Sequence, residues 1–170
     1  KQTNGNVGIG ILNATAKLDV NGSVKANSQI LSSDDRLKYD EELIENSTNI
    51  LMKMRPQKYK KKNSFDDKDD SYLEECGLIV QEIYYEIPEL RYLIKPAHDA
   101  KLTNDYSNVN FSDIKNDPDY DDWGSRQAYL NYNSLIGYLI KGFQEQQLEI
   151  NTLKTELDNI KELLKKNNIV

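Results

Sequence analysis

The segment spanning residues 133–168 restricts the possible folds of this chain more than any other part of its sequence. Side chains recur there at steps of three and four, and all but one are apolar: Ile136, Ile140, Phe143, Gln147, Ile150, Leu153, Leu157, Ile160 and Leu164. No proline interrupts the run, and Asn133 or Ser134 can cap its start. The spacing predicts one long helix with a narrow apolar seam, overwound locally where two three-residue steps adjoin.

Two interpretations of this helix compete: packing on its own domain, or a coiled coil over residues 133–170. The seam is too narrow for a globular core, and charged residues such as Glu149 and Lys154 flank it. Length and seam width therefore favour a coiled coil. Isoleucine at both kinds of seam position favours three strands over two, so we expect a homotrimer.

The opposite end of the chain, residues 1–32, has a different pattern. Val7, Ile9 and Ile11 alternate with glycines or polar residues, and Leu18 and Val20 do the same before the turn signal at 21–22 (Asn-Gly). Short strands with one thin apolar edge are marginal alone, so they predict a β-stem interwoven between copies of the chain.

Residues 33–132 should form a mixed α/β domain between stem and coil, giving an α+β chain overall. Apolar residues from Leu43 to Met54 follow a helical stripe that Pro56 should end. Residues 97–128 form an acidic excursion, expected to be solvated loop, that carries most of the net charge.

Composition excludes several functional classes. With 22 basic and 28 acidic residues the net charge is −6, which argues against nucleic-acid binding. No apolar run is long enough for a membrane span, and a lone Cys76, expected in the core, excludes a disulfide framework. The chain starts at Lys1 without a signal-peptide pattern, as expected for a piece of something longer.

No metal or cofactor is expected. Residues 117–121 open like a calcium loop, but its sixth position is Asp122 where glycine is needed and its twelfth is Ala128 where glutamate is needed. His98 is the only histidine, and there is no G-x-S-x-G elbow, so a Ser-His-Asp triad is not expected.

Four blocks of sequence resemble one known family. Residues 33–38 read S-D-D-R-L-K, residues 77–82 read G-L-I-V-Q-E, and residues 130–136 and 144–147 read L-N-Y-N-S-L-I and Q-E-Q-Q. In this order they resemble the intramolecular chaperone domain of endosialidases and phage tail spikes, the S74 peptidase family. Val80 replaces the family's usual alanine, residues 7–10 and 17–22 are similar to stem repeats that often precede the domain, and the excursion at 97–128 is not explained.

This resemblance implies a trimeric folding module that cuts itself off a viral or phage tail fibre or spike. It would be a single-turnover serine peptidase, acting on a virion precursor in the host cytoplasm with the upstream stem as its folding client. By the family's pattern the nucleophile is Ser33, the base is Lys38, and the cut falls between Ser32 and Ser33. The adjacent serines leave an ambiguity of one residue, which the fixed distance to Lys38 resolves in favour of Ser33.

The chemistry of this pair can also be considered from the residues alone. A serine hydroxyl needs a base, and a lysine serves only when neutral, although an ordinary lysine pKa of about 10.4 keeps it charged. Burial favours the neutral amine. Attack of Ser33 on the carbonyl carbon of Ser32 gives an ester that water hydrolyses. Residues 33 and 38 do not share a helical face, so a turn must bring them together. Taken alone, the pair is more simply a capping serine and a surface lysine.

Supporting roles are less defined. Asp34 and Arg36 either steady the loop or cap the following helix, and Gln81 and Glu82 either pack near the dyad or cross a sheet into solvent. Backbone amides are the expected oxyanion donors. One alternative function is a permanent trimeric knob that binds a receptor or glycan without cleavage. A more remote one is a membrane-tethered transcription factor released by the same module.

Overall fold

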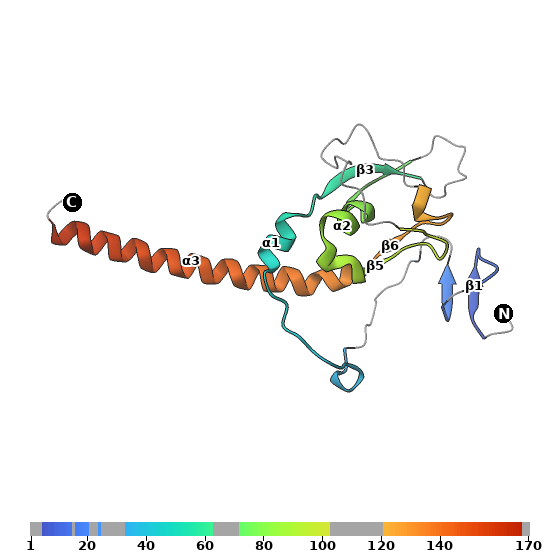
Figure 1. Cartoon of the computed structure of the whole chain (residues 1–170), viewed down its shortest axis with the longest axis horizontal. Coiled ribbons are helices and arrows are strands. Elements are labelled where there is room, and N and C mark those ends of the chain that lie inside the picture. The colour runs from blue at the N-terminus through green and yellow to red at the C-terminus, as the bar shows by residue number, and fades with distance from the viewer. Residues whose placement is uncertain are drawn as a thin grey trace. The chain divides into compact units, whose positions relative to one another are not determined.

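The computed structural model describes residues 5–14, 16–20, 24, 33–62, 72–102 and 121–167. It is mixed α/β with a long C-terminal helix, as expected from the sequence (Figure 1). Its contacts define two compact units, Lys1–Glu41 with Lys60–Glu74, and Glu42–Tyr59 with Glu75–Val170. The strands are β1 (Val7–Ile9), β2 (Leu18–Val20), β3 (Gln57–Lys61), β4 (Leu73–Gly77), β5 (Ile94–Lys95) and β6 (Tyr129–Leu130). The helices are α1 (Ser47–Met52), α2 (Val80–Glu86) and α3 (Leu135–Lys166), with 3-10 turns η1 (Asp35–Leu37), η2 (Pro88–Leu93), η3 (Asp121–Trp123) and η4 (Tyr132–Ser134).

The alternating pattern near the N-terminus does form strands. β1 and β2 pair in parallel, with Val7 opposite Leu18 and Ile9 opposite Val20. Val7, Ile9 and Leu18 are all exposed in the single chain, so this two-stranded sheet buries little apolar surface by itself. The Asn-Gly turn signal at 21–22 and residues 25–32 lie outside the described residues.

The core of the second unit lies where α1, α2, η2 and the first turns of α3 meet. Its buried members are Ile50, Ile83, Ile87, Leu90, Leu93, Ile94, Trp123, Leu135 and Tyr138. β5 and β6 pair antiparallel at its edge, with Ile94 opposite Leu130. β3 and β4 form a separate two-stranded sheet.

Helix α1 is shorter than the apolar stripe predicts. It begins at Ser47 rather than near Leu43, because Asn46 adopts a left-handed conformation with φ of 55° that a continuing helix cannot contain. Leu43 is 87% exposed and so contributes nothing to the core. The helix ends at Met52, before Pro56, as proline sterics require.

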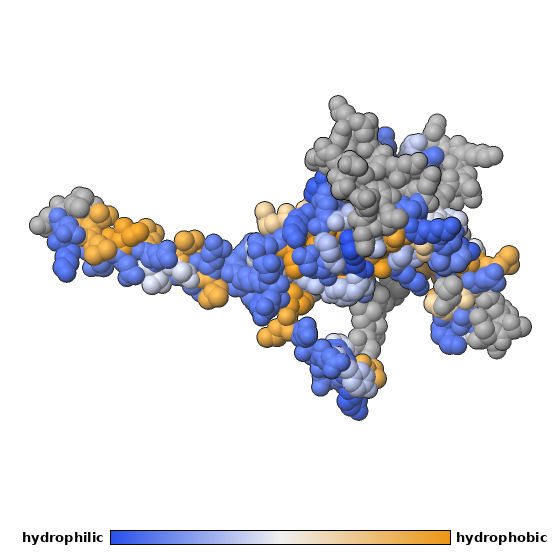
Figure 2. Space-filling model, viewed as in Figure 1, coloured by the Kyte–Doolittle hydropathy of each residue, from blue (hydrophilic) through white to orange (hydrophobic). Residues whose placement is uncertain are grey.

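Helix α3 has 32 residues and presents two different faces. Near its start, Leu135, Tyr138 and Gly142 are buried against the rest of their unit. The predicted seam instead faces away: Ile136, Ile140, Phe143, Ile150, Leu153, Leu157 and Ile160 are all exposed. Figure 2 shows apolar side chains continuing along α3 beyond α1, where the described residues of this unit place nothing opposite them.

Two local expectations are corrected. The side chain that caps the approach to α3 is Asn131, whose Oδ1 accepts from the Ser134 amide at 3.4 Å, whereas Ser134 occupies the N-cap position without a side-chain bond. Cys76 is exposed rather than in the core, because it lies on the two-stranded β3–β4 sheet.

Within the described ranges, no helix has the length and apolar character needed to cross a membrane.

The described ends of the acidic excursion are held together. The Lys101 amide donates to the Asp122 carbonyl at 2.7 Å, and the Ser125 amide donates to the Asp99 carboxylate at 3.1 Å. Hydrogen bonds from Ser125 lower the pKa of Asp99. Residues 103–120, with the first four positions of the calcium-like motif, lie outside the described residues.

Candidate functional site

Ser33 and Lys38 are in contact. The Nζ atom of Lys38 donates to the Oγ atom of Ser33 at 3.0 Å, across five positions of sequence. The turn η1 between them reverses the chain, with the amide of Lys38 bonded to the carbonyl of Asp35 at 2.9 Å. Residues five positions apart do not share a face of an α-helix, but this 3-10 turn brings their side chains together.

Asp34 holds this turn in place. Its Oδ1 atom accepts from the Arg36 amide at 3.0 Å, as an N-cap residue does, and from Arg36 Nε at 3.0 Å. The second guanidinium nitrogen pairs with the other carboxylate oxygen, so the interaction is bidentate. These bonds from Arg36 lower the pKa of Asp34 below its ordinary 3.8, so the carboxylate stays charged to a lower pH. Asp34 and Arg36 thus cap and brace the turn that carries the dyad.

The dyad is open to solvent in the single chain. Ser33 and Lys38 are both exposed, and so are the apolar side chains of Leu37 and Tyr39 on either side of Lys38. The hydrogen bond between the dyad residues has the ammonium as donor and the hydroxyl as acceptor. A neutral amine, which has a lone pair, could instead accept a hydrogen bond from a hydroxyl.

The peptide bond of the expected cut joins Ser33 to Ser32, which lies outside the described residues. The position of the Ser32 carbonyl decides which backbone amides could stabilise an oxyanion during attack. The cut between Ser32 and Ser33 therefore stays a prediction, and so does the assignment of the oxyanion donors to backbone amides.

Gln81 and Glu82 lie on α2, in the second compact unit, and not on a strand. The alternation expected of a strand is absent because residues 80–86 form two helical turns that bury Ile83. Both oxygens of Glu82 accept from Gln57 Nε2 at 2.9 Å, and Arg55 pairs with Glu82 at 3.1 Å. These contacts tie β3 to α2, and a supporting role at the dyad stays a prediction.

Sequence reasoning missed a contact between the segment after the dyad and α3. The carboxylate of Glu145 accepts from the amides of Ser47 and Thr48 at 3.1 and 2.8 Å. The pattern of residues 43–54 hid this contact because it placed 46–48 inside a longer helix. The one sequence signal for this contact was the Q-E-Q run at 144–146, which contains Glu145. That signal can be interpreted only once α1 is known to begin at Ser47.

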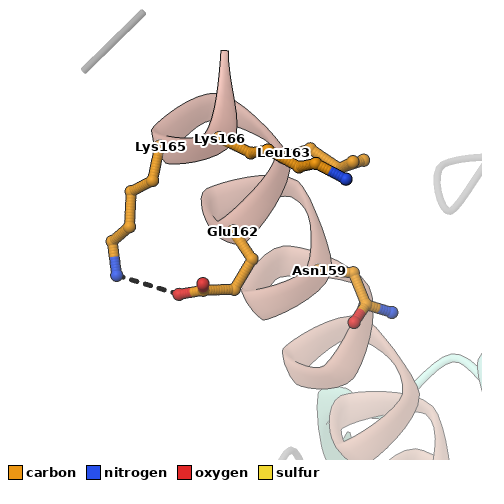
Figure 3. A pocket seen from close by; sticks show the side chains of 5 residues that line it. All are labelled: Asn159, Glu162, Leu163, Lys165 and Lys166. Carbon is orange, nitrogen blue, oxygen red and sulfur yellow. Dashed lines mark hydrogen bonds and ion pairs between the residues drawn. The ribbon is translucent and has the colours of Figure 1, made fainter. Parts of the chain in front are cut away.

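Other candidate sites are weaker. A broad hollow near the end of α3 is bordered by Asn159, Glu162, Leu163, Lys165 and Lys166, all from one helix, so no second described element encloses it (Figure 3). The ion pair between Lys165 and Glu162, 2.9 Å long, is an ordinary surface pair one turn apart.

In the part of the chain that the structure describes, no group of three or more His, Cys, Asp or Glu side chains could hold a metal ion. His98 is 76% exposed.

Comparisons with known proteins agree with the resemblance. Residues 33–92, from the nucleophile candidate through α2, match the model of the peptidase S74 family, described as chaperone of endosialidase. The long tail fibre protein Gp37 of Salmonella phage S16 is 28% identical over 145 residues. That match covers 85% of this chain but only 16% of the relative, so the chain spans a small part of that protein's length. The family match contains the first two of the four sequence blocks, residues 33–38 and 77–82, and confirms the resemblance there.

Proposed function

We propose that a chaperone of the endosialidase type, the family matched by residues 33–92, serves in this chain as the self-cleaving folding module of a phage tail fibre. Three copies would assemble through α3, fold the upstream β-stem as their client, and release themselves by a cut before Ser33. The fibre would be a virion precursor processed in the host cytoplasm. The observation that carries the proposal is the 3.0 Å contact between Lys38 Nζ and Ser33 Oγ in a braced turn.

The proposed reaction needs only these two side chains and water. Neutral Lys38 takes the hydroxyl proton as Ser33 Oγ bonds to the carbonyl carbon of Ser32. The carbon–nitrogen bond then breaks, and the Ser33 nitrogen takes the proton back from Lys38 to leave as a free amine. Water hydrolyses the resulting ester, which leaves a carboxylate on Ser32 and regenerates the Ser33 hydroxyl. No metal or cofactor enters any step.

Assembly would supply the missing condition for this chemistry. An ordinary lysine amine in water is charged and cannot act as a base. In the single chain Lys38, Leu37 and Tyr39 are exposed, and so is the apolar seam of α3. Contact between copies would bury both sets of side chains, and desolvation favours the neutral amine. The cut would therefore follow trimer formation and not precede it.

A folding module that is later discarded has a physical rationale. Parallel pairing as in β1–β2 must overcome loop-closure entropy before it gains contacts, which makes such stems slow to form. A coiled coil holds the chains at high effective concentration during this step. After the cut, the stem cannot unfold by reversing the route by which it folded. The stability of the stem is then kinetic, set by its rate of unfolding.

The test is a comparison of masses after expression. Wild type should yield a fragment of residues 33–170, while Ser33→Ala and Lys38→Ala should keep the full 19.6 kDa chain. Asp35→Ala, an exposed neighbour on the same turn, serves as the matched control and should be cut. N-terminal sequencing of the fragment should begin at Ser33.

Each outcome assigns a function. A trimeric wild-type chain that stays uncut overturns self-cleavage and favours the permanent receptor- or glycan-binding knob. Cleavage of Ser33→Ala at the wild-type position would show that another group is the nucleophile. Cleavage of wild type alone, beginning at Ser33, supports the dyad.

A further inference from the structure

The start of α1 is capped by a residue almost one hundred positions away. Asn46, at the N-cap, makes no side-chain cap bond to the helix. Instead the two carboxylate oxygens of Glu145, on α3, each accept one of the first amides, from Ser47 at 3.1 Å and Thr48 at 2.8 Å. Charged acceptors form stronger bonds with backbone amides than neutral ones do. A single side chain of α3 therefore caps the start of α1.

Further bonds make this junction specific. The Ser47 hydroxyl, fully buried, donates to the Tyr138 carbonyl at 2.7 Å. The Thr48 hydroxyl donates to the Gly142 carbonyl at 3.3 Å, and a Cβ at Gly142 would meet Leu51 Cδ1 at 2.7 Å. α1 thus lies close against α3 over residues 138–145, where the absence of a side chain on Gly142 leaves room for Leu51.

Glu145 occupies a particular place along α3. Residues 138 and 142, which precede it on the same face, contact α1, while Phe143 and Gln147 on either side belong to the predicted seam. Phe143 is 69% exposed in the single chain. The residue that holds α1 therefore lies on the same two turns as side chains that we propose meet neighbouring copies. Any adjustment of these turns on assembly acts on Glu145 directly.

The other side of the junction leads to the dyad. Only residues 39–46 separate Lys38 from Ser47, and the side chain of Ile44 packs against the core of the second unit. Lys38 belongs to the first compact unit and Ser47 and Thr48 to the second, so this short segment of chain connects the dyad to the junction. Hydrogen bonds from Thr48 and Ser47 lower the pKa of Glu145, so the carboxylate that holds their amides is charged at neutral pH.

We propose that Glu145 is a positioning residue for self-cleavage: it anchors the dyad segment to the part of α3 where copies of the chain meet. This inference rests on the proposed function and adds its regulation. Assembly along the seam would fix the turns that carry Glu145, and Glu145 would in turn fix the start of α1 and the segment before it. Without Glu145 the chains can still associate, but the dyad segment is no longer held for the cut.

The experiment compares Glu145→Ala and Glu145→Gln with Glu149→Ala, a matched exposed glutamate one turn further along α3. Cleavage rate, trimer content by light scattering, melting temperature and amide exchange at Ser47 and Thr48 are measured for each full chain. A core variant, Ile83→Val, with a similar fall in melting temperature separates positioning from general stability.

We expect Glu145→Ala to form trimers yet to cleave at least about tenfold more slowly, since charged hydrogen bonds to two amides are lost. Glu145→Gln, which keeps an acceptor oxygen, should recover part of the rate, and Glu149→Ala should equal wild type. Amide exchange should rise at Ser47 and Thr48 only in the Glu145 variants. Ile83→Val should cleave normally.

Three results would overturn the inference while leaving the proposed function intact. These are wild-type cleavage in Glu145→Ala, equal slowing in Ile83→Val at matched stability, or loss of the trimer in both Glu145 variants, which would make the residue a folding requirement. An uncut wild-type chain is a different result, because it defeats the proposed function itself.

Discussion

Lys38 Nζ lies 3.0 Å from Ser33 Oγ, yet both residues are exposed in the single chain. The pair therefore has the distance needed for proton transfer but lacks the dry surroundings that favour a neutral lysine. Under the proposed function, cleavage would therefore depend on association between copies, and association would depend on the exposed seam of α3.

The first prediction concerns the seam of α3. Leu157→Glu places a charge on a seam residue that is half-exposed in the single chain and would be buried between copies. We expect loss of trimers and of cleavage, because burying an unpaired charge in a coiled-coil seam is strongly unfavourable. Light scattering and a cleavage assay on the same sample measure both effects.

Leu148→Glu is the control for this prediction. Leu148 is on the same helix and is 70% exposed, but it lies outside the seam. It should remain trimeric and be cut. Cleavage of a monomeric Leu157→Glu chain at the wild-type rate would contradict the dependence on assembly.

The second prediction concerns the brace of the dyad turn. Asp34→Ala removes the acceptor of the Arg36 amide and of its guanidinium. Because Asp34 is on an exposed turn, the melting temperature should hardly change, while cleavage should slow severalfold as the turn loosens. The melting temperature and the extent of cleavage are measured on the same purified sample, before and after a timed incubation.

The acid dependence of this brace follows from the pKa of Asp34, which Arg36 lowers from its ordinary 3.8. The brace is intact above that ordinary value and is lost as the pH falls through the lowered pKa. Cleavage should therefore not depend on Asp34 ionisation near neutral pH. If Asp34→Ala cleaved as fast as Asp35→Ala, the brace would have no part in the reaction.

Sequence reasoning identified what is local or periodic. The strands β1 and β2 and the long α3 follow from steps of two, three and four, whereas the pairing of Ser33 with Lys38 came from the family resemblance. The start of α1 could not be predicted in this way. Leu43 and Ile44 extend the apolar stripe toward the N-terminus, but the positive φ of Asn46 prevents the helix from including them. A stripe of apolar residues records which side chains could be buried, not where the backbone turns.

Long-range polar contacts were also out of reach. Glu145 reads as one of several charges flanking a coiled-coil seam, and nothing near it in sequence marks it as the cap of a helix 98 positions earlier. Glu82 likewise reads as part of a motif, while its partners Arg55 and Gln57 precede it by more than twenty positions. Such pairs are fixed by tertiary packing, which a single sequence does not encode in any local pattern.

The third prediction concerns Gly77, which opens the second sequence block. A Cβ on this residue would lie 2.7 Å from the Tyr132 hydroxyl and 2.8 Å from that of Tyr59. Gly77→Ala should push the Tyr132 hydroxyl away from the Leu78 amide, which donates to it at 2.9 Å. We expect the free energy of unfolding to fall by about 1 kcal/mol from overpacking and the weakened bond.

Urea unfolding of Gly77→Ala measures this loss, and Gly77→Ala combined with Tyr132→Phe tests its cause. Removing the hydroxyl relieves one of the two close approaches, so the alanine should cost less in the Tyr132→Phe background. An unchanged cost would place the strain at Tyr59 alone.

The fourth prediction concerns the hydroxyl pair of Tyr138 and Tyr92, 3.0 Å apart beside the core. Burial, with a smaller contribution from Tyr92, raises the pKa of Tyr138 from 10.0 to about 12. Between these values the unfolded chain has lost a proton that the folded chain retains, so the free energy of unfolding should fall as the pH rises from about 10 to about 12. Tyr138→Phe removes the titrating group, and its unfolding free energy should decline less steeply over that range. Urea titrations of both proteins at stepped pH give the two slopes, and equal slopes would mean that Tyr138 is not the residue that links alkaline pH to unfolding.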